Sequence, residues 1–275
     1  MTTHSQTVVE SCTAGELAVV VWDGGMASAR FVPSELESLH RSNPSPFLSR
    51  RVIVVEGSTE EGLVRVLLQR EDAARGQHGK VTSPALGVSL CNGGGGSNAC
   101  RKAEEFVALG YRTCLMVDSD DGVTNSKIER VRTKGIAVLQ WPDSADVELA
   151  ILGILEKEEI VSLLYALDNQ GIVSADRMRK DLEETGTAPI GNPLLIGSWD
   201  EYDVEHLRDA IHLACTRKKD NADKGWFKSV ANGAFLGNWL METLGCTIGD
   251  PNSRLSPLFK TACEFAYEIE AYDIE

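Results

Sequence analysis

The chain has 275 residues, of which 43% are hydrophobic, and its 27 basic and 41 acidic side chains give a net charge of −14. This length predicts one large domain, or a domain with a sizeable insertion, that buries its own hydrophobic core. The negative charge argues against general, charge-driven binding of nucleic acid, because neutralising phosphates requires a basic surface. The apolar runs are too short to span a bilayer, and residues 1–10 lack the basic start and apolar centre of a signal peptide.

The cysteines and histidines give no sign of a metal site. Seven cysteines lack any CxxC spacing, and five histidines are scattered without an HExxH motif or a Cys/His cluster. This pattern argues against zinc and favours reduced, buried thiols in a cytoplasmic protein.

The first predicted elements form a β-hairpin over residues 17–32, where two strand-like runs flank the turn sequence Asp23-Gly24-Gly25. A polar, proline-containing bridge follows. From residue 51, short apolar runs alternate with amphipathic helices. The predicted strands are 52–55, 86–91, 113–117 and 136–140, and the predicted helices are 58–70, 98–109, 125–134 and 145–155. This alternation predicts an α/β fold with a doubly wound parallel sheet over residues 50–155.

Beyond residue 156 the strand signals nearly vanish, and the pattern is helical. The predicted helices are 158–169, 175–184, 204–217, 226–244 and 257–267. The sequence therefore predicts three parts: an N-terminal hairpin and linker (1–49), a catalytic core (50–155), and a helical subdomain whose C-terminal helices return to the core (156–275).

Carboxylates follow three of the four predicted strands, at the sheet edge where ligands bind in such folds. They are Glu56 and Glu60, Asp118 and Asp120, and Asp146 and Glu148. Like charges that converge at one edge repel one another unless a cation lies between them. Hard oxygen donors without histidine or cysteine select Mg²⁺ or Mn²⁺, so we expect all six residues to be metal ligands and catalytic residues.

Each acidic motif also has a purely structural interpretation. Glu60 suits the first turn of any helix, Asp146 is a good N-cap, and the DSDDG sequence at 118–122 is compatible with a turn. The four glycines at 93–96 match no phosphate-binding fingerprint and are expected to be a flexible connection. The shared location of these motifs favours the metal interpretation, because independent helix caps have no reason to gather at one sheet edge.

The motifs VVEGSTEEGL (54–63) and LMVDSDDG (115–122) resemble the TOPRIM domain, which is shared by topoisomerases, bacterial primases and a group of nucleases. Three further features are more particular: Glu60 four residues after Glu56, the Asp-x-Glu of 146–148, and KGWFK at 224–228. With these, the chain resembles the nucleases of the overcoming lysogenization defect (OLD) family, class 2. This resemblance implies a TOPRIM-type sheet with a helical insertion. It also implies an ATPase domain that precedes this region and supports oligomerisation. No Walker A motif is present, so we expect that half to be absent and leave open whether Met1 is the native start.

The resemblance implies an endodeoxyribonuclease that cleaves DNA with two Mg²⁺ or Mn²⁺ ions. Two ions about 4 Å apart activate a water and stabilise the leaving oxygen of a phosphodiester. We expect Asp118 to bridge the ions, with Glu60 and Asp120 on one and Glu56, Asp146 and Glu148 on the other. By the same resemblance, Lys228 or Lys224 would contact the phosphate oxygens.

Other functions remain open at this stage. They are a primase-like or topoisomerase-like phosphoryl transferase, a receiver-like signalling domain with Asp118 as phosphoacceptor, and a non-catalytic metal-binding partner of a separate ATPase. Basic groups that are candidates to track a DNA backbone are Arg50, Arg51, Lys127, Arg130, Arg132, Lys134 and residues 217–219.

Overall fold

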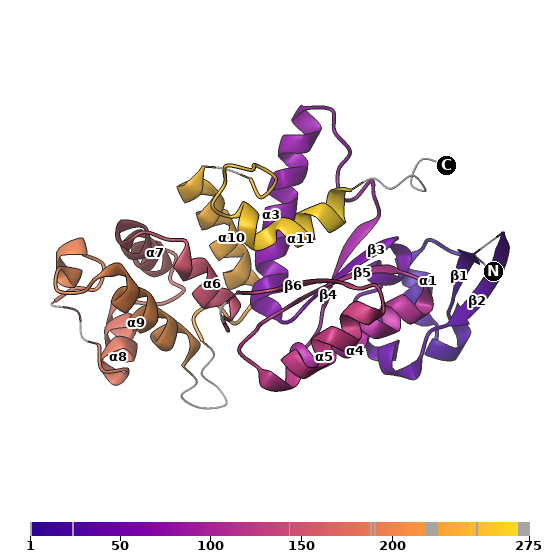
Figure 1. Ribbon diagram of the computed structural model, residues 1–275, viewed down its shortest axis with the longest axis horizontal. Helices are drawn as coiled ribbons and strands as arrows, with labels where there is room; N and C mark the ends of the chain where they lie inside the picture. The colour runs from indigo at the N-terminus through magenta and orange to yellow at the C-terminus, as the bar shows by residue number, and fades with distance from the viewer. Residues whose placement is uncertain are drawn as a thin grey trace. The chain divides into compact units, whose positions relative to one another are not determined.

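The structure is a computed structural model that describes residues 2–23, 25–142, 144–187, 189, 191–217, 225–245 and 247–268 (Figure 1). Internal contacts divide the chain into two compact units. The first comprises Met1–Gly57, Leu68–Gln140 and Phe259–Glu275, and the second comprises Ser58–Leu67 and Trp141–Leu258. Helix α3 (Ser58–Gln77) therefore gives its first part to the second unit and the rest to the first.

The first unit is built on a four-stranded parallel sheet. Its strands are β3 (Arg51–Val55), β4 (Val88–Asn92), β5 (Arg112–Val117) and β6 (Ala137–Gln140), in the order β4-β3-β5-β6. Strands β3 and β5 are the inner pair, with Val55 opposite Met116. Both consist almost entirely of buried residues, as expected for parallel strands covered on two faces. The predicted doubly wound α/β fold is confirmed.

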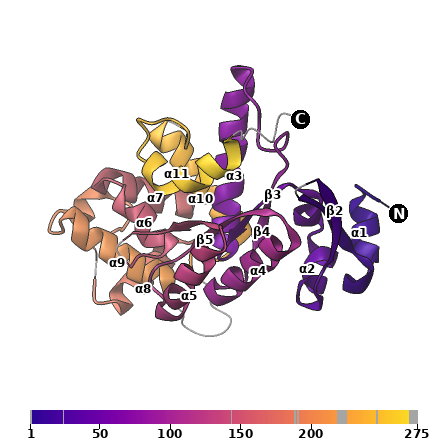
Figure 2. The ribbon, with the colours of Figure 1, turned by 45° about the vertical axis from the view of Figure 1, so that its right-hand side comes forward.

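Helices cover both faces of this sheet. Helices α4 (Gly96–Leu109) and α5 (Gly122–Thr133) lie on one face, and α11 (Ser256–Tyr267) lies on the other (Figures 1 and 2). Because side chains alternate along a strand, Val52 and Val54 join the hydrophobic cluster that contains Phe106 of α4 and Val131 of α5. The inner strands β3 and β5 are thereby covered by helices on both faces.

Helix α11 is fastened to β3 and to the second half of α3. The Tyr267 hydroxyl donates to Asp72 Oδ1 at 2.9 Å, and Arg51 donates to the carbonyl oxygen of Phe265 at 2.9 Å. Arg51 is 1% exposed, so the prediction that it tracks a DNA backbone is wrong. Its charge is instead used inside the protein, against backbone carbonyl groups at the C-terminal end of α11.

The N-terminal segment packs onto the same hydrophobic cluster. It contains α1 (Gln6–Ser11), the antiparallel strands β1 (Ala18–Asp23) and β2 (Met26–Phe31), and α2 (Glu37–Ser42). The predicted hairpin is thus present. Val32 and Phe47 are buried in the cluster, whereas Trp22 and Phe31 point to the hairpin's exposed face and are 73% and 66% exposed.

The second unit is helical, and it includes α6 and the start of α3, which the sequence analysis assigns to the core. Its helices are α6 (Val147–Gly153), α7 (Lys157–Asn169), α8 (Ala175–Glu184), α9 (Val204–Thr216) and α10 (Val230–Leu244), together with the start of α3. Helix α10 begins four residues later than predicted, because the Ser229 hydroxyl caps it by accepting from the backbone N–H of Asn232 at 3.1 Å. None of the described helices is long and apolar enough to cross a bilayer.

Within this unit, α3 and α10 approach each other closely enough to exclude side chains. A Cβ atom on Gly62 would overlap the carbonyl oxygen of Val230 and lie 2.6 Å from the backbone nitrogen of Ala234. A Cβ atom on Gly233 would likewise overlap the Thr59 carbonyl oxygen. The two glycines therefore set the distance between the helices, and this contact fixes the first turn of α3.

An ion pair ties the loop after α10 to the start of α7. Arg254 donates to the carbonyl oxygen of Ile154 at 2.9 Å and to the carboxylate of Glu159. The hydrogen bond from Arg254 lowers the pKa of Glu159 below its usual value, with partial burial acting in the opposite direction. Because the pKa is lower in the folded chain, this pair stabilises the fold above about pH 4.5, the ordinary value for glutamate, and the contribution is lost as the pH falls through the folded pKa.

The Arg254→Met chain is therefore expected to melt at a lower temperature than the wild type at pH 7, by the equivalent of about 1 kcal/mol. The difference should shrink toward pH 3, where only the lost bond to Ile154 remains. Thermal unfolding followed by circular dichroism from pH 3 to 8 measures both effects. Lys260→Met removes an exposed ion pair with Glu264 and serves as the control, with no expected change. A pH-independent difference for Arg254→Met would contradict the assignment.

Candidate functional site

The carboxyl edge of the sheet brings Glu56 and Asp118 together. Glu56 follows β3 and Asp118 follows the neighbouring strand β5, and the register of these strands places the two residues side by side. Glu56 Oε2 accepts a hydrogen bond from the backbone N–H of Asp118 at 3.0 Å. Asp120 lies two residues further on and is exposed. The sequence prediction that β3 and β5 bring acidic residues to one edge is correct for these three residues.

Burial makes Glu56 a poor place for an isolated negative charge. Its pKa is raised, mainly by burial and further by the charges of Asp120 and Asp121, while hydrogen bonds from the backbone N–H groups of Asp118 and Gly96 oppose the rise. A neighbouring cation would favour the ionised form by the same electrostatics. Backbone donors therefore hold the carboxylate in position, although its burial disfavours the charged form.

The glycine run at 93–96 is packed against this edge. A Cβ atom on Gly96 would overlap the Thr124 hydroxyl oxygen and lie 3.1 Å from Glu56 Oε2, and one on Gly93 would lie 2.7 Å from the Val55 carbonyl oxygen. The expectation of a flexible connection is therefore wrong, because these glycines permit a close approach of α4 to the end of β3.

Asp121 has a structural role beside the acidic edge. It is the N-cap of α5 and accepts hydrogen bonds from the backbone N–H groups of Val123 at 3.0 Å and Thr124 at 3.1 Å. These bonds, with one from the Thr124 hydroxyl, lower the pKa of Asp121. The DSDDG sequence thus contains both a helix cap and the acidic pair at 118 and 120.

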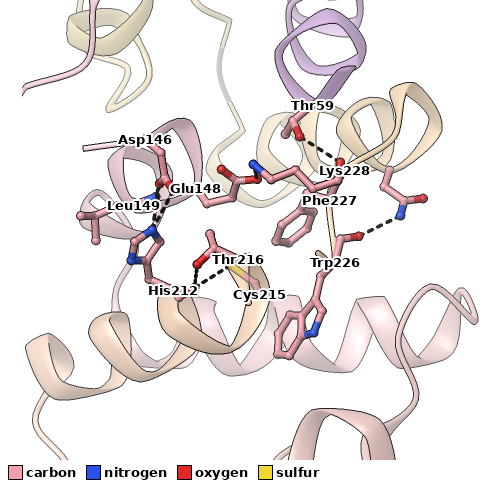
Figure 3. A network of polar contacts seen from close by, with 11 residues as sticks. Thr59, Asp146, Glu148, Leu149, His212, Cys215, Thr216, Trp226, Phe227 and Lys228 are labelled. Carbon is pink, nitrogen blue, oxygen red and sulfur yellow. Dashed lines mark hydrogen bonds and ion pairs between the residues drawn. The ribbon is translucent and has the colours of Figure 1, made fainter. Parts of the chain in front are cut away.

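In the second unit, Asp146 is held from two sides at the start of α6 (Figure 3). It is the N-cap of the helix, where Oδ1 accepts from the backbone N–H of Leu149 at 2.8 Å. Nε2 of His212, on α9, lies 3.0 Å from Oδ1 and 2.9 Å from Oδ2. Burial raises the pKa of Asp146, but the bonds from His212 and Leu149 outweigh it, so the net pKa is lowered. The bond to Asp146 also raises the pKa of His212, so the two groups favour their charged forms together.

Glu148 points into the same helical unit and is paired with Lys228 (Figure 3). Lys228 Nζ lies 2.8 Å from Glu148 Oε1, and the glutamate side chain is completely buried whereas that of the lysine is 38% exposed. Among the described residues, Glu148 Oε2 has no hydrogen-bond partner. Lys228 therefore balances a buried carboxylate and keeps part of its side chain accessible.

The other residues of the KGWFK motif include structural anchors. The Trp226 indole N–H donates to Asp181 Oδ2 at 2.9 Å, and the Phe227 carbonyl oxygen accepts from the Thr59 hydroxyl at 3.0 Å. Both aromatic rings are buried, so they are core residues, as the sequence analysis favours for aromatic side chains in this setting. Lys224 lies outside the described residues.

Glu60 belongs with the second unit. It lies in the first turn of α3 and is 4% exposed. Its neighbour Thr59 is fixed by the bond to the Phe227 carbonyl, so the start of α3 and the segment that carries Lys228 are directly connected. The predicted ligands thus fall into two groups, with Glu56, Asp118 and Asp120 in the first unit and Glu60, Asp146 and Glu148 in the second.

The donor chemistry of both groups suits a hard divalent cation. All six side chains are carboxylates, and Glu148 Oε2 is a buried oxygen atom without a hydrogen bond in the described part of the chain. Within that part, however, no three His, Cys, Asp or Glu side chains are already placed to hold one ion. The residues fit a metal by chemistry, and the idea that all six share two ions stays a prediction.

Sequence reasoning missed His212 and several neutralising contacts among the basic residues. His212 lies 66 positions from Asp146, in a helix without a metal-binding motif. The sequence feature that could have pointed to it is its position beside the buried residues Ile211 and Cys215 of the same helix. The predicted DNA-tracking residues Arg130 and Lys134 both pair with Glu104, at 2.7 and 3.1 Å. Such pairings depend on the fold and have no local sequence signature.

The comparisons with known proteins identify the segment around the acidic edge. Residues 47–120 match the family model described as overcoming lysogenization defect protein-like, TOPRIM domain. The matched segment includes the first four predicted ligands, from Glu56 to Asp120. No match is found among curated proteins or among solved structures.

Proposed function

We propose, from the premise that residues 47–120 are a TOPRIM domain of the OLD type, that this chain is a metal-dependent DNA endonuclease. TOPRIM domains bind divalent metal ions and belong to enzymes of nucleotidyl transfer and nuclease type. The observation that carries the proposal is the juxtaposition of Glu56 and Asp118 at the carboxyl edge of β3 and β5, inside the matched segment. At that edge, parallel sheets of this kind bind their ligands.

The proposed cofactor is Mg²⁺ or Mn²⁺, held by Glu56, Asp118 and Asp120 and by Glu60, Asp146 and Glu148. Two such ions supply an activated water and stabilise the leaving oxygen of a phosphodiester. The assignment of Asp118 as the bridging ligand, and the division of the other five between two ions, remain predictions. In this proposal the carboxylates would hold the cations in position. The positive charge of the cations would in turn compensate the negative charges of the carboxylates.

The lysines of the KGWFK motif are proposed to contact the non-bridging phosphate oxygens. Lys228 supports this role because its side chain is 38% exposed although Nζ contacts Glu148. An ammonium group close to the phosphate stabilises the charge that develops on the phosphate oxygens in the transition state. Lys224 remains the second candidate for this contact.

The proposed physiological setting is an assembly that also contains an ATPase domain. The resemblance to OLD nucleases supports an ATPase partner, oligomerisation through it, and DNA as the substrate in the cytoplasm. The net charge of −14 means that DNA contact would depend on local basic groups and bound cations.

Nicking of supercoiled plasmid tests the function directly. We expect the purified chain to convert supercoiled plasmid to the nicked form in Mn²⁺ or Mg²⁺, with complete loss of cleavage in excess EDTA. Glu56→Gln should abolish nicking, because it removes the charge at the centre of the acidic edge. A chain that leaves the plasmid intact in both metals, after its fold is verified by circular dichroism, would refute the endonuclease assignment.

The same preparation separates the rival functions. A primase-like enzyme would incorporate nucleotides, and a receiver-like domain would be labelled by a small phosphodonor. A topoisomerase-like role needs an accessible nucleophilic tyrosine: Tyr111 and Tyr267 are buried and donate hydrogen bonds to Phe47 and Asp72, whereas Tyr165 is exposed, so covalent trapping of DNA on a tyrosine would reveal this role. A non-catalytic partner module would bind Mn²⁺ without any of these reactions.

A further inference from the structure

His212 makes a contact that packing alone does not require. Its Nε2 atom lies within 3.0 Å of both carboxylate oxygens of Asp146, and its side chain is 22% exposed (Figure 3). The histidine lies on α9 and the aspartate at the start of α6, so the contact joins two helices of one unit. The pair is therefore positioned by tertiary structure rather than by local sequence.

The hydrogen bonds leave one oxygen of Asp146 available. A carboxylate offers about four acceptor positions, two on each oxygen. Oδ1 accepts from the Leu149 backbone N–H and lies close to His212 Nε2, whereas Oδ2 contacts His212 alone among the residues that the structure describes. Oδ2 is thus oriented by the histidine and keeps an acceptor position for another group.

The helix that carries His212 is anchored by a buried face. Leu207, Ala210, Ile211 and Ala214 belong to the buried face of α9, and the partly exposed His212 lies beside this face. Asp203, at the N-cap of the same helix, provides an internal comparison: it contacts His206 Nδ1 at 2.9 Å, but both side chains are largely exposed. The helix therefore carries two Asp–His contacts, of which only the one with Asp146 joins a predicted metal ligand.

We propose that His212 is a positioning residue that orients Asp146 for divalent-cation binding; this inference rests on the proposed function, in which Asp146 is a ligand. Hydrogen-bonding partners of metal-ligating carboxylates fix ligand orientation, and their loss weakens metal affinity by about 10–100-fold. The histidine donates through Nε2 and needs no contact with the cation or the DNA. A contact that served only to hold α6 against α9 would affect stability and leave metal affinity unchanged.

The test measures Mn²⁺ binding by calorimetry on the full chain without DNA. The relevant quantity is the Mn²⁺ affinity of the tightest site that Asp146→Asn weakens. His212→Ala should lower this affinity by about 10–100-fold. His212→Gln keeps an N–H donor near the position of Nε2 and should restore most of the lost affinity. His206→Ala is the matched control and should bind as the wild type does. Because His212 acts through Asp146, adding His212→Ala to Asp146→Asn should cause no further loss.

The outcomes separate this inference from the proposed function. Wild-type affinity in His212→Ala, or an additive loss in the double variant, would overturn the positioning role. So would a His212→Gln chain that melts like the wild type but binds Mn²⁺ as weakly as His212→Ala. A wild-type chain that binds Mn²⁺ but nicks no plasmid would end the nuclease proposal, while the affinity series would still decide the role of His212.

Discussion

The Asp118→Asn chain is expected to fold normally and to nick plasmid more than about 100-fold more slowly than the wild type. This loss should exceed the 10–100-fold that removal of a supporting partner causes, because Asp118 is proposed to contact the cations itself. The substitution preserves shape and removes the negative charge beside Glu56. The backbone N–H of Asp118, which donates to Glu56 Oε2, is left in place. Initial nicking rates over a range of Mn²⁺ concentrations measure the effect.

Asp121→Ala is the matched control for this prediction. Asp121 lies three residues away, but its carboxylate caps α5. Its loss should lower the free energy of unfolding, because the cap of α5 is removed, and leave the nicking rate at assay temperature within about twofold. Equal loss of nicking in the two variants would show that general negative charge at this edge matters, and would contradict a specific role for Asp118.

Gly62→Ala is expected to be strongly destabilising, because Gly62 makes the closest approach among the glycines that the structure describes. The added Cβ would overlap the Val230 carbonyl oxygen, so α3 and α10 must move apart and lose contact along their crossing. Overpacking of this kind costs about 1–3 kcal/mol and occasionally more, and backbone atoms that cannot rotate away place this site at the upper end. Chemical denaturation monitored by tryptophan fluorescence measures the change.

Gly76→Ala, in the same helix, should have the opposite sign. No atom lies within 4 Å of a Cβ at that position, and alanine favours the helix over glycine by about 0.5–1 kcal/mol. The pair of variants therefore separates helix propensity from close packing. Similar stabilities for the two would mean that α3 and α10 do not cross at Gly62.

The sheet was predictable because its signal is local. Buried runs such as Val52–Val55, separated by helices and short loops, leave few alternatives to a parallel sheet. The ends of the helices depend on contacts that sequence does not show. Helix α3 continues to Gln77, beyond the predicted end at residue 70, and there Arg75 stacks on the ring of Tyr267 from the far end of the chain.

The site was predictable to the extent that strand topology determines it. Glu56 and Asp118 follow adjacent strands, so their meeting is a consequence of strand order. The partners His212 and Lys228 reach Asp146 and Glu148 through tertiary packing of helices, which has no period or motif. The burial of Arg51 was hidden for the same reason, because an arginine at a strand start is exposed until a C-terminal helix covers it.

The contacts of His212 and Lys228 also bear on the order of assembly. Side chains of the polypeptide already act as counter-ions for Asp146 and Glu148 in the second unit. Small zinc domains, by contrast, collapse when chelated because the ion alone offsets the charges of their ligands. We therefore expect this unit to fold without bound cations, so that removing divalent metal would abolish nicking and leave the fold intact.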